Sequence, residues 1–563
     1  MDNSNLYSYH VFLFPFQWKL TGRSHENANL EQQSDLLPFM QLLKGSAWKR
    51  SNFETDAIIY FNEKNYFYPF VRDILYDTSK EPSGIAPEFI AHYEYDIMSE
   101  SMDYTIQISP DKTYILKIDS ILLHLYNTGI GIISFHLNNR LKSQSDAEDI
   151  LIINQFGRRL YPPFLSVDPE FIGKQGQYAY NNYQQGLKGV KKAELAQSIS
   201  VGHFKEDWSR YEYSVSLEKE PFIIPEFIKG LFATVPITGK IEFKSEDTAV
   251  FIKPVLGDRM FVVCWYGNDE FVDAVRADVT GEYDFKAIIN ETGEYAYLYN
   301  EWLYKFTFID KGLSCQNDRM RIEAMKNHIN ARWVNYGTLF GVSRYSFVAV
   351  TQSLQASGFR ENAAFVINHV QTMYYKLVEL SLVQRASILK FSDEVARVSI
   401  MAETKDLGQQ VNSLYKQYIR FVNKVYFREV TAEEQGIELY DLLQEKMRID
   451  KNVTDLDKEI NELHNYLNIV EESRRNNYLE VLTKLGAAFM IPTFIVGFFG
   501  MNMFNSGVEF NEFSSVAFVL VMSIIPAIIL FFINRKKQVS LVPIAVGYII
   551  LLTIMFFVTK ILF

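Results

Sequence analysis

The run that decides the architecture is Leu482–Asn502, which reads LTKLGAAFMIPTFIVGFFGMN. Most of it falls within a stretch of 24 residues, Leu485–Val508, that contains no Asp, Glu, Lys or Arg. A helix needs about 20 mainly apolar residues to cross the hydrocarbon core of a bilayer. The run therefore predicts a membrane-spanning helix over residues 483–502.

Two more uncharged runs follow, each 22 residues long. They predict further spans over residues 514–534 and 540–559. A buried core helix is the alternative for any one run, but three runs in succession argue against it. For the last run the alternative is a re-entrant segment, because Pro543 and Gly547 can break a helix.

The charges beside these runs predict their orientation. Three basic residues lie within 474–484, ahead of the first span, and Arg535–Lys537 follow the second span. The loop between the two spans carries Glu509 and Glu512 and no basic residue. The positive-inside rule then places both flanks in the cytoplasm. Met1–His10 lacks the basic start of a signal peptide, so the first ~480 residues are expected to be cytoplasmic.

The composition narrows the function classes. The 563 residues carry a net charge of −11, from 56 Lys and Arg against 67 Asp and Glu. This balance argues against direct nucleic-acid binding, which needs a basic surface. The two cysteines, Cys264 and Cys315, exclude a disulfide scaffold and a cysteine zinc cluster. The mean hydropathy of −0.07 resembles that of a soluble protein, because a long polar front dilutes the apolar end.

The chain is expected to form four parts. Residues 1–325 read as a mixed α/β ligand-sensing domain, with stretches rich in β-branched and aromatic residues that are typical of strands. Residues 326–430 read as a helical domain, 431–484 as a long stalk helix, and 485–563 as the transmembrane domain. Strands are expected at Tyr9–Phe16, Ala57–Tyr60, Tyr114–Leu125, Gly131–Leu137, Ala249–Lys253 and Met260–Tyr266, and helices at Ala147–Phe156, Lys192–Ile199, Glu361–Leu380, Ser381–Met401 and Asp406–Val425.

An apolar heptad pattern leads into the first span. Its members recur at alternating spacings of four and three residues, which is the signature of a coiled-coil seam. Two interpretations fit equally: a seam between subunits, or an amphipathic helix packed on its own domain. The pattern consists of Ile449, Val453, Leu456, Ile460, Leu463, Leu467 and Val470.

Signals of catalysis are weak. The sequence has no GxxxxGK[ST] phosphate loop and no HExxH metal motif. Gly129-Ile130-Gly131 lacks the third glycine of a dinucleotide fingerprint and is better explained as a turn between strands. Cys264 lies in an apolar strand and is expected to be a small buried side chain. The chain is therefore not expected to be an enzyme.

One face of the first predicted span is less bulky and more polar than the rest. Spacings of 4, 4, 3, 4 and 4 residues place its members on one side of a helix. Glycines would leave width, a threonine offers a hydroxyl, and the larger side chains could form constrictions that gate by dewetting. The alternative is a small-residue interface between helices. The face consists of Leu482, Gly486, Met490, Thr493, Gly497 and Met501.

The motif at the end of this helix resembles a known family. Met-x-Pro-Thr-Phe-Ile-x-Gly at 490–497, then Gly500-Met501-Asn502 and a second span, is similar to the CorA family of divalent-cation channels over Asp441–Lys537. The resemblance implies an α+β membrane protein with a CorA-like funnel, in which five subunits line a pore with their first spans. It further implies that Gly500 and Met501 shape the turn, and that a ring of Asn502 amides binds hydrated Mg²⁺ or another divalent cation through water.

The chain also departs from that family. Met503–Glu509 lacks the family's proline, a third apolar run follows, and the region before the membrane is longer by some two hundred residues. This enlarged form resembles CorA-like proteins encoded beside type III CRISPR systems. That resemblance implies an antiviral effector of the bacterial inner membrane, opened by a nucleotide second messenger of the S-adenosylmethionine–AMP or cyclic oligoadenylate kind. The alternatives are a conventional Mg²⁺ or Co²⁺ uptake channel gated by the metal, and a non-conducting receptor or scaffold.

Two arginine-containing segments are candidates for binding such a ligand. Arg158 and Arg159 follow a predicted helix, and Tyr161 could stack on a nucleobase. Asp258 and Arg259 lie in a turn between two predicted strands. Arginine binds phosphate through a planar fork of N–H donors and stacks on bases. The alternative is that these arginines form salt bridges within an acidic protein.

Overall fold

The computed structural model describes residues 5–21, 34–51, 53, 57–76, 89–97, 102–161, 165–167, 190–192, 196–208, 224–239, 248–279, 284–355, 360–400 and 406–500. The chain divides into two compact units, Met1–Leu463 and His464–Phe563. The expected boundaries at 325/326 and 430/431 therefore fall inside the first unit. The predicted GMN residues Met501 and Asn502, and the second and third predicted spans, lie outside the described residues.

The first unit is built on one large sheet of fourteen described strands. Its strands are β1 (Ser8–Thr21), β2 (Trp48–Arg50), β3 (Ile90–Tyr95), β4 (Asp103–Ser109), β5 (Lys112–Tyr126), β6 (Ile130–Asn139), β9 (Ser198–Val201), β10 (Phe204–Asp207), β11 (Ile237–Thr238), β12 (Ala249–Pro254), β13 (Phe261–Gly267), β16 (Ile329–Asn330), β17 (Leu339–Ser343) and β18 (Ser346–Thr351). Two small hairpins stand apart, pairing β7 (Leu165–Val167) with β8 (Val190–Lys192) and β14 (Arg276–Asp278) with β15 (Phe285–Ala287).

The main path through the sheet runs β10-β9-β4-β5-β6-β1-β13-β18-β17-β16. Neighbours on this path are antiparallel except β13 and β18, which are parallel. The long strand β1 pairs with β6 along one edge, and with β13 and then β12 along the other. Between β5 and β6 the chain turns at Gly129, whose φ of +75° favours glycine. The turn predicted there is confirmed.

Both faces of the sheet are covered. On β1, Phe12, Phe14 and Phe16 belong to one hydrophobic cluster, while Val11 and Leu13 belong to another. Successive side chains of a strand point to opposite faces, so the two clusters lie on the two sides of the sheet. A strand that is buried on both faces is apolar almost without interruption, and this explains the composition of β1, β6 and β13.

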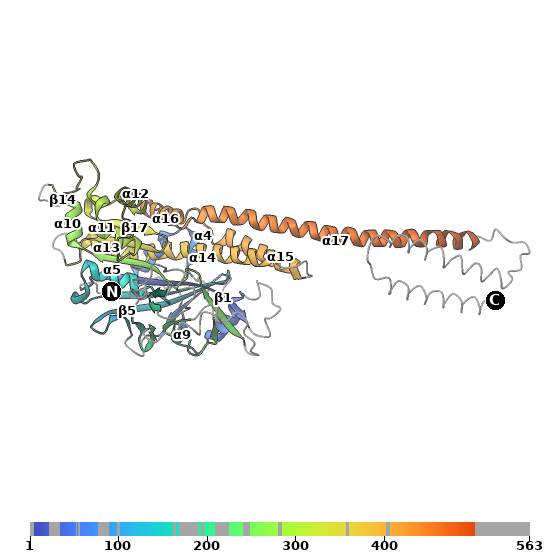
Figure 1. Ribbon diagram of the computed structural model, residues 1–563, viewed down its shortest axis with the longest axis horizontal. Helices are drawn as coiled ribbons and strands as arrows, with labels where there is room; N and C mark the ends of the chain where they lie inside the picture. The colour runs from blue at the N-terminus through green and yellow to red at the C-terminus, as the bar shows by residue number, and fades with distance from the viewer. Residues whose placement is uncertain are drawn as a thin grey trace, which may run out of the picture. The chain divides into compact units, whose positions relative to one another are not determined.

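The described helices divide between these two clusters. Helices α5, α9 and α11 contribute to the cluster around Phe12, and α13, α14, α16 and the start of α17 contribute to the cluster around Val11. Figure 1 shows α14 lying along the sheet. The bounds are α2 (Leu36–Leu43), α3 (Ile58–Tyr66), α4 (Pro69–Leu75), α5 (Ala147–Gly157), α9 (Glu226–Leu231), α10 (Asp269–Val275), α11 (Glu301–Phe308), α12 (Asp318–His328), α13 (Arg360–Gln371), α14 (Met373–Ser399), α15 (Asp406–Lys424), α16 (Glu434–Met447) and α17 (Ile449–Gly500).

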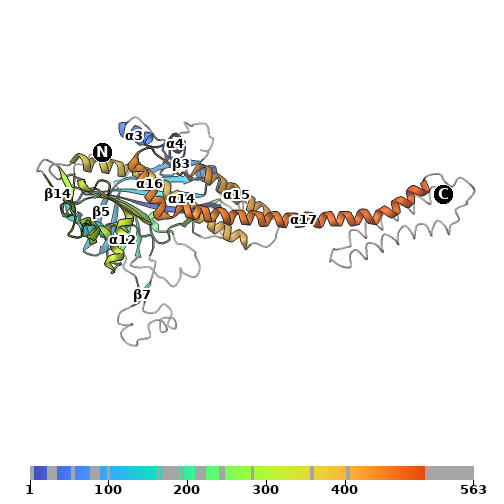
Figure 2. The ribbon, with the colours of Figure 1, turned by 90° about the horizontal axis from the view of Figure 1, so that it is seen from above.

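Helix α14 is the central helix of the unit. Every residue from Met373 to Ile388 is buried, so this half of the helix has no solvent-facing side. A helix that is buried all round must find partners for its polar side chains inside the protein. Helices α3 and α4 lie near β3, as Figure 2 shows, and α4 is tied to the loop before α16 by a hydrogen bond from Tyr68 N to Val430 O.

The start of α17 packs on its own unit. Ile449, Val453, Leu456 and Ile460 are buried in the cluster around Val11, and Leu463 packs against that cluster. This part of the heptad pattern therefore follows the second of the two interpretations, an amphipathic helix packed on its own domain. The helix then continues without a break to Gly500.

Two expectations about secondary structure were wrong. Residues Ala57–Tyr60 are the start of helix α3 and not a strand, because the polar sequence Asn62–Asn65 continues a helical turn. In Lys192–Ile199, expected to be helical, Lys192 ends β8 and Ser198 begins β9. The strands β16, β17 and β18 extend the sheet to Thr351, well past residue 325. For the two wrong expectations, pairing with distant strands or packing overrode the local pattern.

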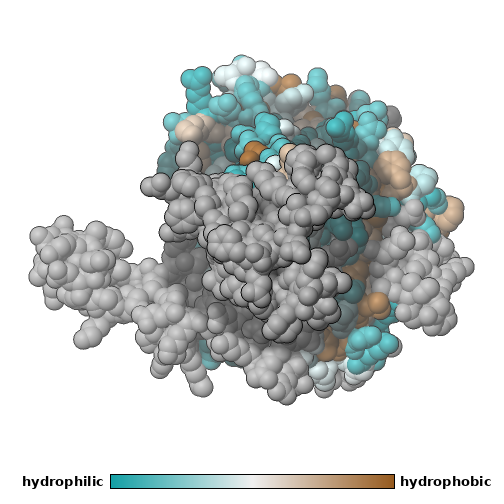
Figure 3. All heavy atoms as spheres, turned by 90° about the vertical axis from the view of Figure 1, so that its right-hand side faces the viewer, coloured by the Kyte–Doolittle hydropathy of each residue, from teal (hydrophilic) through white to brown (hydrophobic). Residues whose placement is uncertain are grey.

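Among the described residues, no helix combines the length and the apolar character needed to cross a bilayer. Of the first predicted span, 483–502, the structure describes the helix as far as Gly500. On the side seen in Figure 3, the described surface is mainly hydrophilic, with small separated hydrophobic patches.

Packing of α17 on its own unit predicts the effect of Leu456→Ala. The side chain is 1% exposed, and its truncation should lower the free energy of unfolding by about 2–5 kcal/mol. The matched control on the same helix is Ile469→Ala, which is 65% exposed and should change stability by less than about 0.5 kcal/mol. Thermal unfolding of the full chain in detergent checks both variants. An unchanged midpoint for Leu456→Ala, together with a smaller particle mass, would instead indicate a seam between subunits.

Candidate functional site

The predicted pore face is helical and exposed in the described part of α17. Leu482 is 64% exposed and Met490 is 72% exposed, and Gly486 and Thr493 are exposed as well. The hydroxyl of Thr493 donates a hydrogen bond to Phe489 O at 2.7 Å, which leaves its oxygen lone pairs available as acceptors.

The rest of this face is less fully described. A Cβ atom added at Gly486 would meet no atom within 4 Å, so the single chain does not require a glycine there. Gly497 and Gly500 lie in the same continuous helix. An exposed face of apolar and small residues needs a second surface, which is either another helix or a shared lumen.

The two predicted ligand segments lie side by side. Arg159 and Arg259 form an isolated antiparallel β-bridge. Met260 N donates to Arg158 O at 2.8 Å, and Leu160 N donates to Asp258 O at 2.9 Å. Residues that are about one hundred positions apart in the sequence therefore form one cluster. The sequence alone presented them as two separate candidates.

The side chains of this cluster divide into two groups. Asp258 forms ion pairs with Arg159 and, at 3.1 Å, with Arg259, so the salt-bridge alternative holds for these two arginines. Arg158 is 3% exposed and donates from Nη2 to Ile309 O at 3.2 Å. Tyr161 packs against the hydrophobic cluster around Phe12.

Burial and mutual repulsion disfavour the charge on Arg158. Burial, followed by the charges of Arg159 and Arg259, lowers the pKa of Arg158 to about 9, against the opposing effect of Asp258. Burial also lowers the pKa of Arg159. The cluster remains cationic at neutral pH, with three guanidinium groups and one carboxylate.

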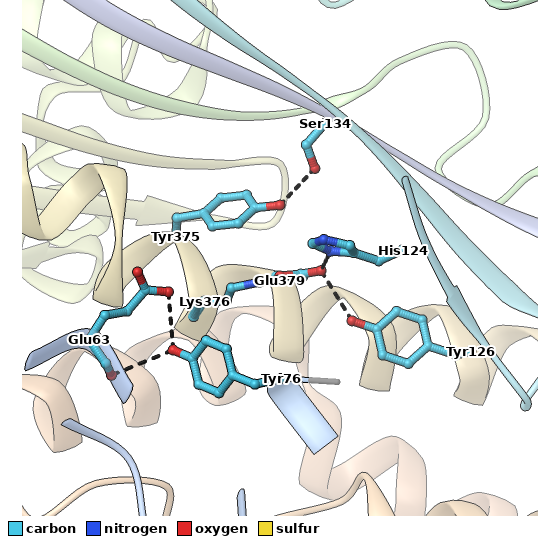
Figure 4. A network of polar contacts seen from close by, with 8 residues as sticks. All are labelled: Glu63, Tyr76, His124, Tyr126, Ser134, Tyr375, Lys376 and Glu379. Carbon is cyan, nitrogen blue, oxygen red and sulfur yellow. Dashed lines mark hydrogen bonds and ion pairs between the residues drawn. The ribbon is translucent and has the colours of Figure 1, made fainter. Parts of the chain in front are cut away.

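A second polar cluster joins α14 to the sheet (Figure 4). The carboxylate of Glu379 forms an ion pair with Lys376 at 2.8 Å. It also accepts hydrogen bonds from His124 Nδ1 and, at 3.1 Å, from Tyr126 Oη. Burial alone would raise the pKa of Glu379, but His124 and Lys376 outweigh it and hold that pKa below its usual range. Burial lowers the pKa of His124, against the opposing charge of Glu379.

The same network reaches α3 and strand β6. Tyr76 Oη donates to Glu63 Oε1 at 3.1 Å, and Tyr375 Oη shares a hydrogen bond of 2.9 Å with Ser134 Oγ. Burial raises the pKa of Glu63 to about 7, against the opposing charge of Lys376. The network thus contains one carboxyl group that stays ionised and one that titrates near neutral pH.

The polar network around Glu379 could not be predicted from the sequence. His124 and Glu379 are 255 residues apart and come from a strand and a helix, so no local spacing links them. Within the described ranges, no group of three or more His, Cys, Asp or Glu side chains is arranged to hold a metal ion. Cys264 is buried as expected, and burial raises the pKa of its thiol to about 12.

The fold is a mixed α/β domain followed by long helices. Comparison with protein families matches residues 349–536 to the family described as CorA-like Mg²⁺ transporter protein, so this part of the chain is a CorA-like domain. The match confirms the resemblance drawn over Asp441–Lys537 and begins further upstream, within β18. Among solved structures, the chain is similar to the CorA magnesium transporter from Methanocaldococcus jannaschii, with 12% identity, a TM-score of 0.22, and coverage of 36% of this chain and 71% of that chain. No curated protein matches the chain.

The raised pKa of Glu63 predicts that stability depends on pH. The unfolded chain releases this proton near pH 4.5 and the folded chain near pH 7, so the native state loses stability as the pH rises between these values. The full loss is on the order of 3 kcal/mol. Glu63→Gln removes it, so the variant should unfold at a higher temperature than the natural chain at pH 8, with no difference near pH 4.

Thermal unfolding of the full chain in detergent at both pH values measures this effect. The control, Glu445→Gln, replaces a carboxyl group whose side chain is 69% exposed, and it should shift the midpoint little at either pH. Equal midpoints for Glu63→Gln and the natural chain at pH 8 would contradict the assignment.

Proposed function

We propose that five copies of this chain assemble into a CorA-like channel for Mg²⁺ or a related divalent cation. The observation that carries the proposal is the family match over residues 349–536, which includes α17 and the first two predicted spans. The proposal is one of transport, not of catalysis. It places residues 483–502, 514–534 and 540–559 in the bacterial inner membrane as a multi-pass protein, with the N-terminus in the cytoplasm.

The number of helices in one chain requires the assembly. Two or three spans cannot enclose an aqueous path, whereas a ring of identical subunits places one copy of each side chain around a common axis. The exposure of Leu482 and Met490 in the single chain supports this role, since exposed apolar side chains on a helix call for another surface. In the assembly, the face from Leu482 to Met501 lines the lumen.

The chemistry at the outer end of this helix suits a hydrated cation. Mg²⁺ gives up its water reluctantly, so an outer ring of Asn502 amide oxygens would hold the ion through its water shell. Glu509 and Glu512 would raise the local concentration of cations by their negative potential. Thr493 and the glycines at 497 and 486 would keep the lumen wide enough below that ring.

We further propose that the unit before the membrane binds a nucleotide second messenger that opens the channel. The cationic cluster of Arg158, Arg159 and Arg259 supports an anionic ligand of this kind. The messenger classes under test are S-adenosylmethionine–AMP and cyclic oligoadenylate, as for a type III CRISPR-associated effector in antiviral defence. A second candidate is Mg²⁺ or Co²⁺ uptake regulated by the metal itself, which fits the description of the matched family as CorA-like Mg²⁺ transporter protein.

Flux through liposomes that contain the full chain tests the proposal. The natural chain should carry Mg²⁺ into the liposomes, where a Mg²⁺-sensitive dye reports it. Asn502→Ala should lower this flux about tenfold, which corresponds to a loss of roughly 1.4 kcal/mol in ion binding. Ile469→Ala is the control and should leave the flux unchanged, since the residue is exposed and lies off the predicted pore face.

The same assay separates the candidates. Flux that requires an added messenger supports messenger gating, and flux that falls as Mg²⁺ rises on the cytoplasmic side supports metal gating. Absence of flux with every messenger and every Mg²⁺ concentration contradicts transport and leaves the receptor or scaffold alternative.

A further inference from the structure

The cluster around Arg158 extends beyond the two segments found in the sequence. Tyr345, in the turn between β17 and β18, has two guanidinium groups against its ring. The Cζ atom of Arg259 lies 5.2 Å from the ring centroid, and that of Arg385 from α14 lies 5.0 Å away. Arg385 also donates from Nη1 to Arg344 O. Four separate segments of the first unit therefore meet at this cluster.

Positive charge exceeds negative charge among these described side chains. Arg158, Arg159 and Arg259 share the single carboxylate of Asp258, and Arg385 lies against the ring of Tyr345. That carboxylate already pairs with Arg159 and Arg259, so its acceptor capacity is largely used. Exposure falls from 26% for the side chain of Arg259 to 13% for that of Arg159, and Arg158 is 3% exposed. The cluster thus leads from a half-buried rim to a buried guanidinium.

Arg158 lacks acceptors for most of its N–H groups. Its Nε and Nη1 atoms are buried and make no hydrogen bond, and only Nη2 has a partner, Ile309 O. The nearby carboxylate of Asp258 only partly offsets the cost of this buried charge, because Asp258 also pairs with Arg159 and Arg259. Each buried donor without an acceptor adds to the cost. Structures keep such a group when something else supplies the missing charge and the missing acceptors.

We infer that Arg158, Arg159 and Arg259 form a binding site for a phosphate group, with Arg385 next to it across Tyr345. A phosphate carries up to two negative charges at neutral pH and has several acceptor oxygens, so it supplies both of the things that Arg158 lacks. Water could satisfy the N–H groups but would leave the charge uncompensated. A carboxylate ligand would supply one charge and only two oxygens, against three or more cations.

Binding here would act on α14 directly. Arg385 belongs to α14, whereas Arg158 follows α5 on the other face of the sheet. A phosphate bound at Arg259 would reach α14 through the ring of Tyr345, which contacts both Arg259 and Arg385. The binding itself is independent of the proposed transport, and only its effect on flux rests on that proposed function.

The test uses the full chain in detergent, without Mg²⁺, and measures binding by calorimetry and by the thermal unfolding midpoint. Pyrophosphate is the first probe, compared with chloride at equal ionic strength. The natural chain should bind it and unfold at a higher temperature, and Arg158→Met and Arg259→Ala should each weaken binding by about 10- to 100-fold. Arg397→Ala is the control, because this arginine is half exposed and pairs with Glu394 away from the cluster.

The stability of Arg158→Met distinguishes an arginine that binds phosphate from one that only supports the fold. Without phosphate, the variant should be as stable as the natural chain or more stable, because it removes an uncompensated charge. With phosphate present, the natural chain should gain stability and the variant should not. A second probe, ADP, identifies the source: tighter binding than pyrophosphate assigns the phosphate to a nucleotide, and weaker binding assigns it to a free polyphosphate.

Absence of binding by either probe would overturn the inference, as would binding that survives both Arg158→Met and Arg259→Ala. Mg²⁺ flux in a chain that fails to bind phosphate would overturn the site and leave transport intact. Binding without flux would support the site and count against transport.

Discussion

The first unit depends on how a fully buried carboxylate is neutralised. Glu379 lies on the side of α14 that faces the sheet, where no water can compensate its charge. Lys376 supplies the charge, and His124 and Tyr126 supply donors from β5. Breaking such a pair by removing one partner costs about 3–5 kcal/mol, so only one placement of α14 on the sheet satisfies it. The packing of α13, α16 and α17 follows from that placement, because all three share a cluster with α14.

This arrangement makes the CorA-like domain part of a larger fold. The family match begins at residue 349, in the strand β18, which pairs with β13 and β17. The preceding 348 residues therefore do not form a separate appendage, since their strands and the matched helices share the hydrophobic cluster around Val11. A ligand bound among the arginines would touch the sheet and α14 together. The core around α14 is also the core on which the first five heptad positions of α17 rest.

Much of this could be predicted from the sequence where the signal is local. Stretches rich in β-branched and aromatic residues located β1, β5, β6, β12 and β13, and the motif at 490–502 indicated the family. The pairing of Glu379 with His124 could not be predicted, because it joins residues 255 positions apart that show no shared pattern. The cluster at Arg158 was found only as two separate candidates, and Tyr345 and Arg385 were missed because tertiary packing alone brings them there. Helix α3 was misread as a strand because its apolar residues Ile58–Tyr60 resemble one over so short a stretch.

The central claim is that copies of this chain gather around a common axis lined by the helix from Leu482 to Asn502. The mass of the detergent-solubilised particle, measured by native mass spectrometry, tests it most directly. The account predicts a mass of five times the 65.4 kDa of one chain, held together without added ligand. A particle with the mass of a single chain would contradict it, because one copy has too few helices to enclose a path for ions.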